Sequence, residues 1–164
     1  MFQPSTTRRL SSTAAAVAVL ALAAAPAPAS AADFFDPVGT HDVASCSTLA
    51  GWAKDGDTTL PTSVHIYLGA PFPFGTFVTA TTANLFRPDL PFADKNHGFS
   101  IATPSAFFTG CPEKVYIHAI DIDTSGAPVP GGNNALLNLT GKTIICGTPN
   151  PSCFEPPPKP PFDP

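Results

Sequence analysis

Proline and glycine interrupt this chain so often that a long helix does not fit into it. The sequence holds 21 prolines and 12 glycines among 164 residues, and either residue weakens or ends a helix when it falls inside one. Between these interruptions the apolar segments are short and rich in β-branched residues, which favours strands. One of them, SVHIYLG at residues 63–69, alternates strictly between apolar and polar or aromatic positions, as a half-buried strand does.

The same pattern recurs along most of the chain. We therefore expect an all-β fold, a single immunoglobulin-like or fibronectin-like antiparallel β-sandwich of about seven strands, with a jelly roll as the alternative. The expected strands cover residues 38–44, 46–54, 63–69, 75–83, 97–103, 114–123 and 142–146.

The two ends of the chain differ from this middle part. Residues 1–31 are typical of a secretory signal peptide, because Arg8 and Arg9 precede a short apolar core that ends in small residues, with cleavage expected near Ala31 or Ala32. A retained membrane anchor is the alternative interpretation of the apolar core. We expect the sandwich domain at residues 38–147 and a proline-rich tail at 148–164, in which EPPPKPP (155–161) forms an extended polyproline II segment.

Charge excludes some partners. Once Arg8 and Arg9 leave with the signal, six basic residues face twelve acidic ones, a net charge of −6. A basic stripe for phosphates is missing from the sequence, so we expect no nucleic-acid partner. The mature protein is expected to be a secreted monomer without a membrane span.

The cysteine count indicates disulfides. An even number of cysteines in an exported chain is typical of oxidised pairs, and none of the four lies in a C-x2-C arrangement that would indicate zinc. Two disulfides are expected, and spacing alone leaves three connectivities open. The four are Cys46, Cys111, Cys146 and Cys153.

Six short motifs occur in a characteristic order: GWAKD (51–55), VHIYLG (64–69), FRPDL (86–90), HGF (97–99), VYIHAID (115–121) and KTIIC (142–146). Their order resembles a β-sandwich module of secreted bacterial proteins, which occurs alone, in tandem or appended to cell-wall hydrolases and other extracellular enzymes. The resemblance covers about residues 38–147 and implies a non-catalytic accessory domain. This chain departs from the pattern in an inserted APFPFG (70–75), in an extra cysteine pair and in its proline tail.

The resemblance also implies a disulfide pairing. In the module, a cysteine before the GWA strand pairs with one that closes the last strand, which here implies Cys46 with Cys146. Cys111 is then left to pair with Cys153. A bridge that closes about 100 residues is worth ~4.7 kcal/mol in the chain-entropy model.

The densest polar cluster, PFADKNHGFS at residues 91–100, follows the RPDL motif and has two interpretations. Its side chains can line a polar pocket for an extracellular polysaccharide or a surface protein, with an aromatic stacking face. Alternatively, they hold a long connection in shape by bonding backbone groups and each other, with Gly98 in a backbone conformation that other residues avoid. We favour the second interpretation. The candidate binding residues are Arg87, Asp89, Phe92, Asp94, Asn96 and His97.

Other candidate residues have simpler interpretations. Trp52 is expected to anchor the core. Asp121 and Asp123 fall on one face of an expected strand and are a weak candidate for calcium. His65 and His118 can be neighbours across two strands, but two ligands do not make a zinc site, and no metal or other cofactor is expected.

The leading functional hypothesis is a secreted, non-catalytic module that binds or decorates an extracellular surface. The first alternative is a small secreted hydrolase that uses Asp94 and His97, although neither a G-x-S-x-G motif nor a partner serine supports it. The second alternative is a purely structural spacer protein.

Overall fold

The computed structural model describes residues 35–154. The expected signal peptide and the proline segment at 155–161 lie outside these residues. The described elements, in chain order, are β1 (Val38–Ala44), β2 (Thr48–Lys54), β3 (Ser63–Leu68), β4 (Thr76–Thr82), β5 (Leu85–Phe86), β6 (Asn96–Ala102), η1 (Ser105–Phe107), β7 (Pro112–Ala119), β8 (Lys142–Ile145) and η2 (Pro151–Cys153).

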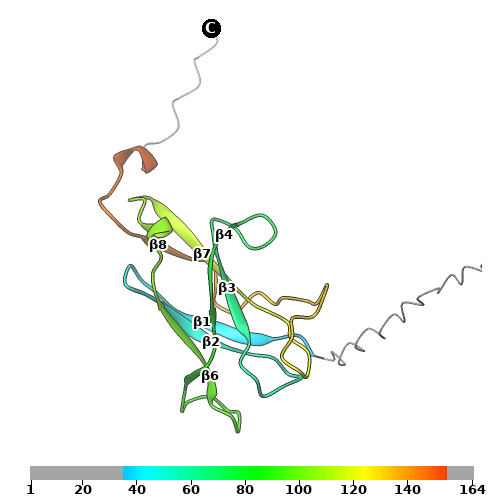
Figure 1. The fold of residues 1–164 in the computed structure, drawn as a ribbon. Coiled ribbons are helices and arrows are strands. Elements are labelled where there is room, and N and C mark those ends of the chain that lie inside the picture. The colour runs from blue at the N-terminus through cyan, green and yellow to red at the C-terminus, as the bar shows by residue number, and fades with distance from the viewer. Residues whose placement is uncertain (1–34, 155–164) are drawn as a thin grey trace, which may run out of the picture.

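The strands form two antiparallel four-stranded sheets packed face to face (Figure 1). One sheet has the order β1-β2-β6-β5 and the other the order β4-β3-β7-β8. This is the strand order of an immunoglobulin-like sandwich with one extra strand, β4, beside β3. The expected fold class is confirmed.

Seven of the strands were expected from the sequence, and β1 has the expected bounds. Two differences have physical reasons. The two-residue β5 is too short to give an alternating pattern. Strand β7 ends at Ala119 rather than at residue 123, because the chain there turns away and Ile122 makes only an isolated bridge with Pro128.

The core lies between the two sheets. Alternation places Leu49 and Ala53 of β2 and Phe99 of β6 inward from one sheet, against Ile66 of β3 and Ile117 of β7 from the other, all within 2% of complete burial. Fully burying a side chain of this size contributes roughly 1.5–3 kcal/mol. The outward positions on the same strands are therefore the ones available for function.

The segment that precedes β8 joins the two sheets along one edge. Asn138 donates its backbone N–H to Gly39 of β1 (3.0 Å) and accepts a bond from the N–H of His41 (2.9 Å). On its other side, Leu137 donates to the carbonyl of Ile117 in β7 (2.9 Å). The edge of β1 is thus paired, which removes a strand that another chain could otherwise extend.

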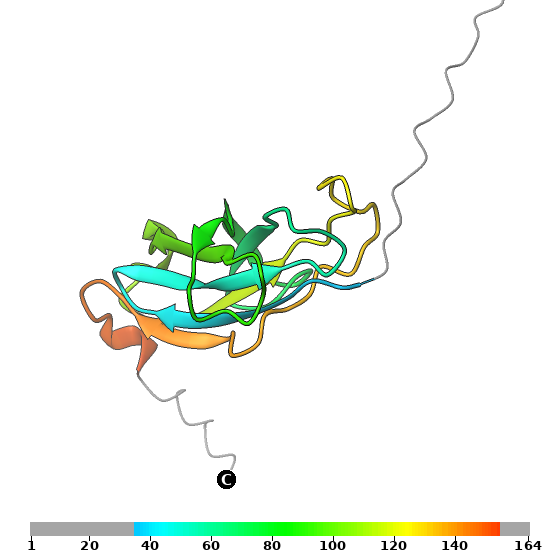
Figure 2. The ribbon, with the colours of Figure 1, turned by 90° about the horizontal axis from the view of Figure 1, so that it is seen from below.

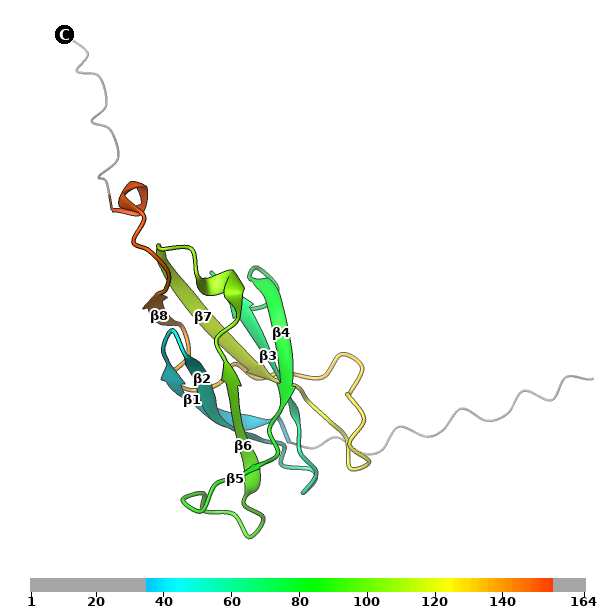
Figure 3. The ribbon, with the colours of Figure 1, turned by 60° about the vertical axis from the view of Figure 1, so that its left-hand side comes forward.

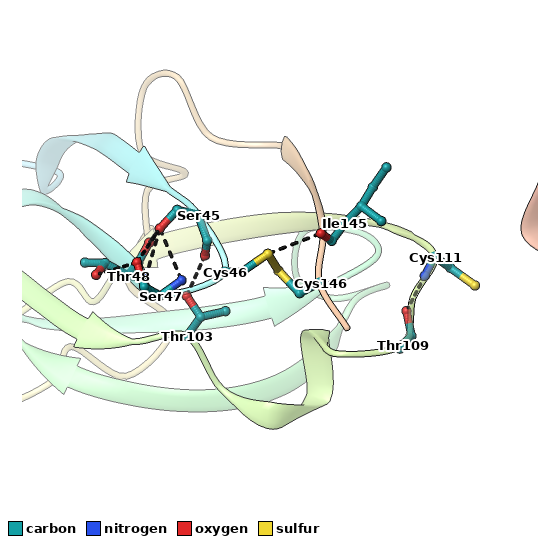
Figure 4. The surroundings of a disulfide bond; sticks show 9 residues. All are labelled: Ser45, Cys46, Ser47, Thr48, Thr103, Thr109, Cys111, Ile145 and Cys146. Carbon is teal, nitrogen blue, oxygen red and sulfur yellow. Dashed lines mark hydrogen bonds between the residues drawn. A yellow bond between two sulfur atoms is a disulfide. The ribbon is translucent and has the colours of Figure 1, made fainter. Parts of the chain in front are cut away.

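The cysteine pairing implied by the resemblance is confirmed. Cys46 pairs with Cys146 and Cys111 pairs with Cys153, with Cα–Cα distances of 5.3 and 5.6 Å, inside the usual range for disulfides. Figure 4 shows the first bridge between the β1–β2 turn and the end of β8. The second bridge ties η2 to the start of β7.

The two ends of the sandwich carry different loops. Figure 2 shows the segment after β7 (yellow) and η2 (red) at opposite ends of the molecule. Figure 3 shows that the loop between β5 and β6, which holds most of the candidate residues, also lies at the end away from η2.

Candidate functional site

The candidate residue Arg87 lies directly after β5 and is held by carboxylates on both sides. Its Nε and one terminal nitrogen donate to Asp89 (2.8 and 2.6 Å), and the other terminal nitrogen donates to Asp42 of β1 (2.8 Å). The bonds to Arg87 lower the pKa of Asp89 to about 2. The expected two-pronged bond is therefore present, and sequence reasoning missed only Asp42, which is 45 residues away.

His97, on β6, is completely buried. Its Nε2 lies 3.6 Å from Oδ2 of Asp94, and burial lowers the pKa of the imidazole, opposed by the charge of that carboxylate. The other oxygen of Asp94 accepts bonds from the backbone N–H (3.0 Å) and the side-chain amide (2.9 Å) of Asn96. The backbone bond is the main reason why the pKa of Asp94 is lowered. These bonds fix the turn into β6.

Phe92 covers this buried imidazole rather than standing clear of the surface. Its ring packs edge-on against His97 (6.2 Å between centroids) and against Trp52 (5.5 Å), with Nζ of Lys54 5.6 Å from its centroid. The expectation that Trp52 anchors the core was wrong. Gly51 and Ala53 take the inward positions of β2, so Trp52 lies half-buried on the outer face.

Gly98 is needed for a different reason from the one expected. Its φ is not among the positive values found elsewhere in the chain. A Cβ at this position would instead lie 2.6 Å from Cγ of Arg87 and 2.9 Å from the carbonyl oxygen of Leu85. The glycine lets the arginine stem lie across β6, which places the guanidinium between its two carboxylates.

A second and more open feature lies on the outer face of the other sheet. His65 and Tyr67 of β3 are the direct neighbours of His118 and Tyr116 of β7, which confirms that the two histidines are adjacent. Aromatic rings from the next strand and from the inserted loop complete a cluster: Tyr67 contacts Phe77 (5.7 Å) and Phe72 (6.1 Å).

This cluster borders a groove with two adjoining hollows of about 420 and 240 Å³. Both hollows share Phe72, His118 and Asn134. Their lining is uncharged apart from the titratable imidazoles, and consists of Pro71, Phe72, His65, Tyr67, His118, Ile120, Gly132, Asn133, Asn134 and Leu136.

His118 links the two walls of the groove. Its Nε2 accepts the backbone N–H of Phe72 (3.2 Å), and its Nδ1 lies 3.0 Å from the carbonyl oxygen of Asn134. Because a backbone N–H can only donate and a carbonyl can only accept, these contacts assign the proton to Nδ1 and a neutral ring. Burial is the main cause that lowers the pKa of His65.

The inserted APFPFG loop forms one wall and turns back over the sheet. The N–H groups of Phe74 and Gly75 both donate to the carbonyl of Pro71 (2.9 Å each), which closes the turn. Phe72 remains 58% exposed on the rim of the groove, and Phe74 is 86% exposed at the turn. The APFPFG segment thus builds this wall of the groove.

The opposite wall is the segment after β7, and Asp121 organises it. The N–H of Asp121 donates to Oδ1 of Asn134 (2.9 Å), and Oδ2 of Asp121 accepts the N–H of Asn133 (2.8 Å). The amide nitrogen of Asn133 donates to Asp36 (2.8 Å), which lies before β1. The sequence offered only a weak signal for this wall, the Asn-Asn dipeptide after two glycines.

The calcium candidates Asp121 and Asp123 lie beyond the end of β7 and so do not share a strand face. Asp123 accepts bonds through Oδ1 from the N–H and the hydroxyl of Ser125 (2.8 and 2.5 Å), and the hydroxyl is the main cause of its lowered pKa. Within residues 35–154, no three His, Cys, Asp or Glu side chains cluster as metal ligands would. The expectation that no cofactor is bound, with calcium at these two residues as the weak alternative, stays a prediction.

Comparison with protein families, with curated proteins and with solved structures found no match to this chain. In the part of the chain that the structure describes, no helix has the length and apolar character needed to cross a membrane.

Proposed function

We propose that this protein is a secreted, non-catalytic β-sandwich module that binds an extracellular polysaccharide surface through the groove between β3, β7 and the 70–75 loop. The observation that carries the proposal is the exposed ring of Phe72 on the rim of a groove whose opposite wall holds two asparagine amides. An apolar concavity with a few fixed polar groups is the usual form of a ligand site.

Three further observations support the proposal. The N-terminal sequence is typical of a secretory signal. Two disulfides fit an oxidising compartment outside the cytoplasm. The module that the motifs resemble is an accessory domain of extracellular proteins, which agrees with binding rather than catalysis.

The hydrolase alternative finds less support. It requires His97 to reach a substrate, but the imidazole is completely buried beneath Phe92. Geometry is the first requirement for a general base, before its pKa. The ion-paired loop at residues 87–97 supports a structural role, because the bonds of Arg87 tie the loop to β1 and those of Asp94 fix its turn into β6.

Co-sedimentation with insoluble cell walls, chitin and cellulose tests the proposal. The full chain is expected in the pellet, and Phe72→Ala is expected largely in the supernatant. Phe86→Ala is the matched control, because this phenylalanine is 66% exposed but lies on β5 of the other sheet. Release of soluble sugar would favour the hydrolase. If the protein stays in the supernatant with all three materials, the spacer alternative is favoured.

A further inference from the structure

The orientation of two side-chain amides narrows the chemistry of the ligand. Because Oδ1 of Asn134 accepts the N–H of Asp121, the orientation of this amide is fixed by a partner that can only donate. The amide nitrogen of Asn134 bonds to no residue between 35 and 154, so it is the group that this residue can offer to a ligand.

The side-chain amide of Asn133 is held by its nitrogen, whereas that of Asn134 is held by its oxygen. The nitrogen of Asn133 donates to the carboxylate of Asp36, which can only accept when ionised. The carbonyl oxygen of Asn133 is therefore the group left for a ligand. Two consecutive residues that line the same hollow thus offer one hydrogen-bond donor and one hydrogen-bond acceptor.

A hydroxyl group is the natural partner for such a pair, because it donates one hydrogen bond and accepts others. Neighbouring hydroxyls on a sugar ring can satisfy both amides at once. A proline-rich peptide offers carbonyl acceptors but no N–H at its prolines, so the oxygen of Asn133 would remain unpaired. An anionic ligand would meet the carboxylates of Asp36 and Asp121, which accept bonds from the side-chain amide and from the backbone N–H of Asn133.

The facing wall supplies a matching apolar surface. Phe72 is 58% exposed, and its backbone is held by the bond to His118, the same ring that contacts the backbone of Asn134. The backbone that carries the stacking ring and the backbone of the wall with the two amides are therefore tied together before a ligand arrives. Such preorganisation reduces the ordering cost of binding.

From this arrangement we infer that the groove binds an uncharged pyranose unit of a polysaccharide, with the apolar face of the sugar on Phe72 and its hydroxyls on Asn133 and Asn134. The inference rests on the proposed binding function and names its ligand class.

Binding of the full chain to a glycan panel tests the inference. The neutral arm is cellulose, chitin, β-1,3-glucan, mannan and galactan, the anionic arm is polygalacturonate, and the peptide arm is octaproline. We expect retention on at least one neutral glycan and on neither polygalacturonate nor octaproline. Asn134→Asp removes the donor while keeping the acceptor for Asp121, and is expected to weaken neutral-glycan binding about tenfold.

Two further variants keep the test decisive if Asn134→Asp folds poorly. Phe72→Leu keeps an apolar side chain without a flat ring and should also lose binding. Asn84→Asp, at an exposed position between β4 and β5, adds the same charge away from the groove and should bind like the wild type. Thermal melts of all variants identify losses that are due to unfolding.

The failures of the two claims are distinguishable. Retention on polygalacturonate or octaproline alone, abolished by Phe72→Leu, would overturn the sugar assignment and leave the binding module intact. A lack of retention in all three arms would overturn both. Neutral-glycan binding that is unchanged in Asn134→Asp and Phe72→Leu would show that the glycan binds elsewhere and would also overturn the inference.

Discussion

Acidification from pH 7 to pH 5 is expected to destabilise the sandwich through the buried imidazole of His41. This residue lies on β1 with no exposed surface, where its Nε2 contacts the carbonyl oxygen of Val43 (3.0 Å) and its Nδ1 faces the hydroxyl of Thr140 (3.4 Å). Burial is the main cause that lowers its pKa from 6.5 to about 4, and the positive charge of Lys142 acts in the same direction.

The direction of this pH effect on stability follows from proton binding by His41. Between pH 6.5 and about 4 the unfolded chain holds the proton on His41 and the folded chain does not. The free energy of unfolding therefore falls as the pH falls, and the contribution of His41 is complete above the unfolded pKa. At ~1.4 kcal/mol for each unit of pKa difference, the loss reaches up to about 2 kcal/mol at pH 5 and about 3 kcal/mol at pH 4.

Urea unfolding followed by Trp52 fluorescence measures this loss. Wild type and His41→Gln are compared at pH 7 and at pH 5, a range that lies above the titration of the carboxylates with lowered pKa values. His65 and His97, whose pKa values are also lowered, remain in both proteins and cancel in the comparison. His41→Gln should be less stable at pH 7 but should lose about 2 kcal/mol less on acidification. An equal loss in the two proteins would refute the argument.

Three further predictions concern stability. Arg87→Ala should lower the free energy of unfolding by about 1 kcal/mol and the Tm by about 3–5 °C, because its bonds to Asp42 and the following loop are lost from a partly exposed position. An unchanged Tm would contradict the structural role of Arg87. Gly98→Ala should cost about 1–3 kcal/mol in urea unfolding, because its Cβ would meet a backbone carbonyl oxygen at 2.9 Å. Replacing Cys46 and Cys146 together by alanine should lower the free energy of unfolding by ~4–5 kcal/mol, since their bridge closes a separation of 100 residues. A smaller loss of stability than for Gly98→Ala would count against the loop-closure account.

Much of the fold follows from local patterns. The alternation in residues 63–69 placed Val64 and Ile66 inward and His65 and Tyr67 outward, as the structure has them. Reasoning from residue type alone failed for Trp52, because the inward positions of β2 beside it are taken by Gly51 and Ala53. A large apolar side chain does not reveal which face of a strand points into the core when the neighbouring residues are small.

The candidate site was harder to predict, because its parts come together only through the tertiary fold. The polar cluster at 91–100 was a candidate site because of its many polar side chains, but its hydrogen bonds are made within the loop. The groove depends on Phe72 of an inserted loop meeting His118, 46 residues later in the chain. No local sequence pattern predicts that contact, since it depends on the pairing of β3 with β7.

Mapping a bound oligosaccharide by NMR tests the central claim most directly. Titration of the full, isotope-labelled chain with the soluble oligomer of whichever neutral glycan retains it should shift the backbone amide signals of Phe72, His118 and Asn134. The signals of Arg87 and Asp94 should stay in place, because their loop lies apart from the groove lining. Shifts confined to the loop at residues 87–97, with the groove signals unchanged, would contradict the account.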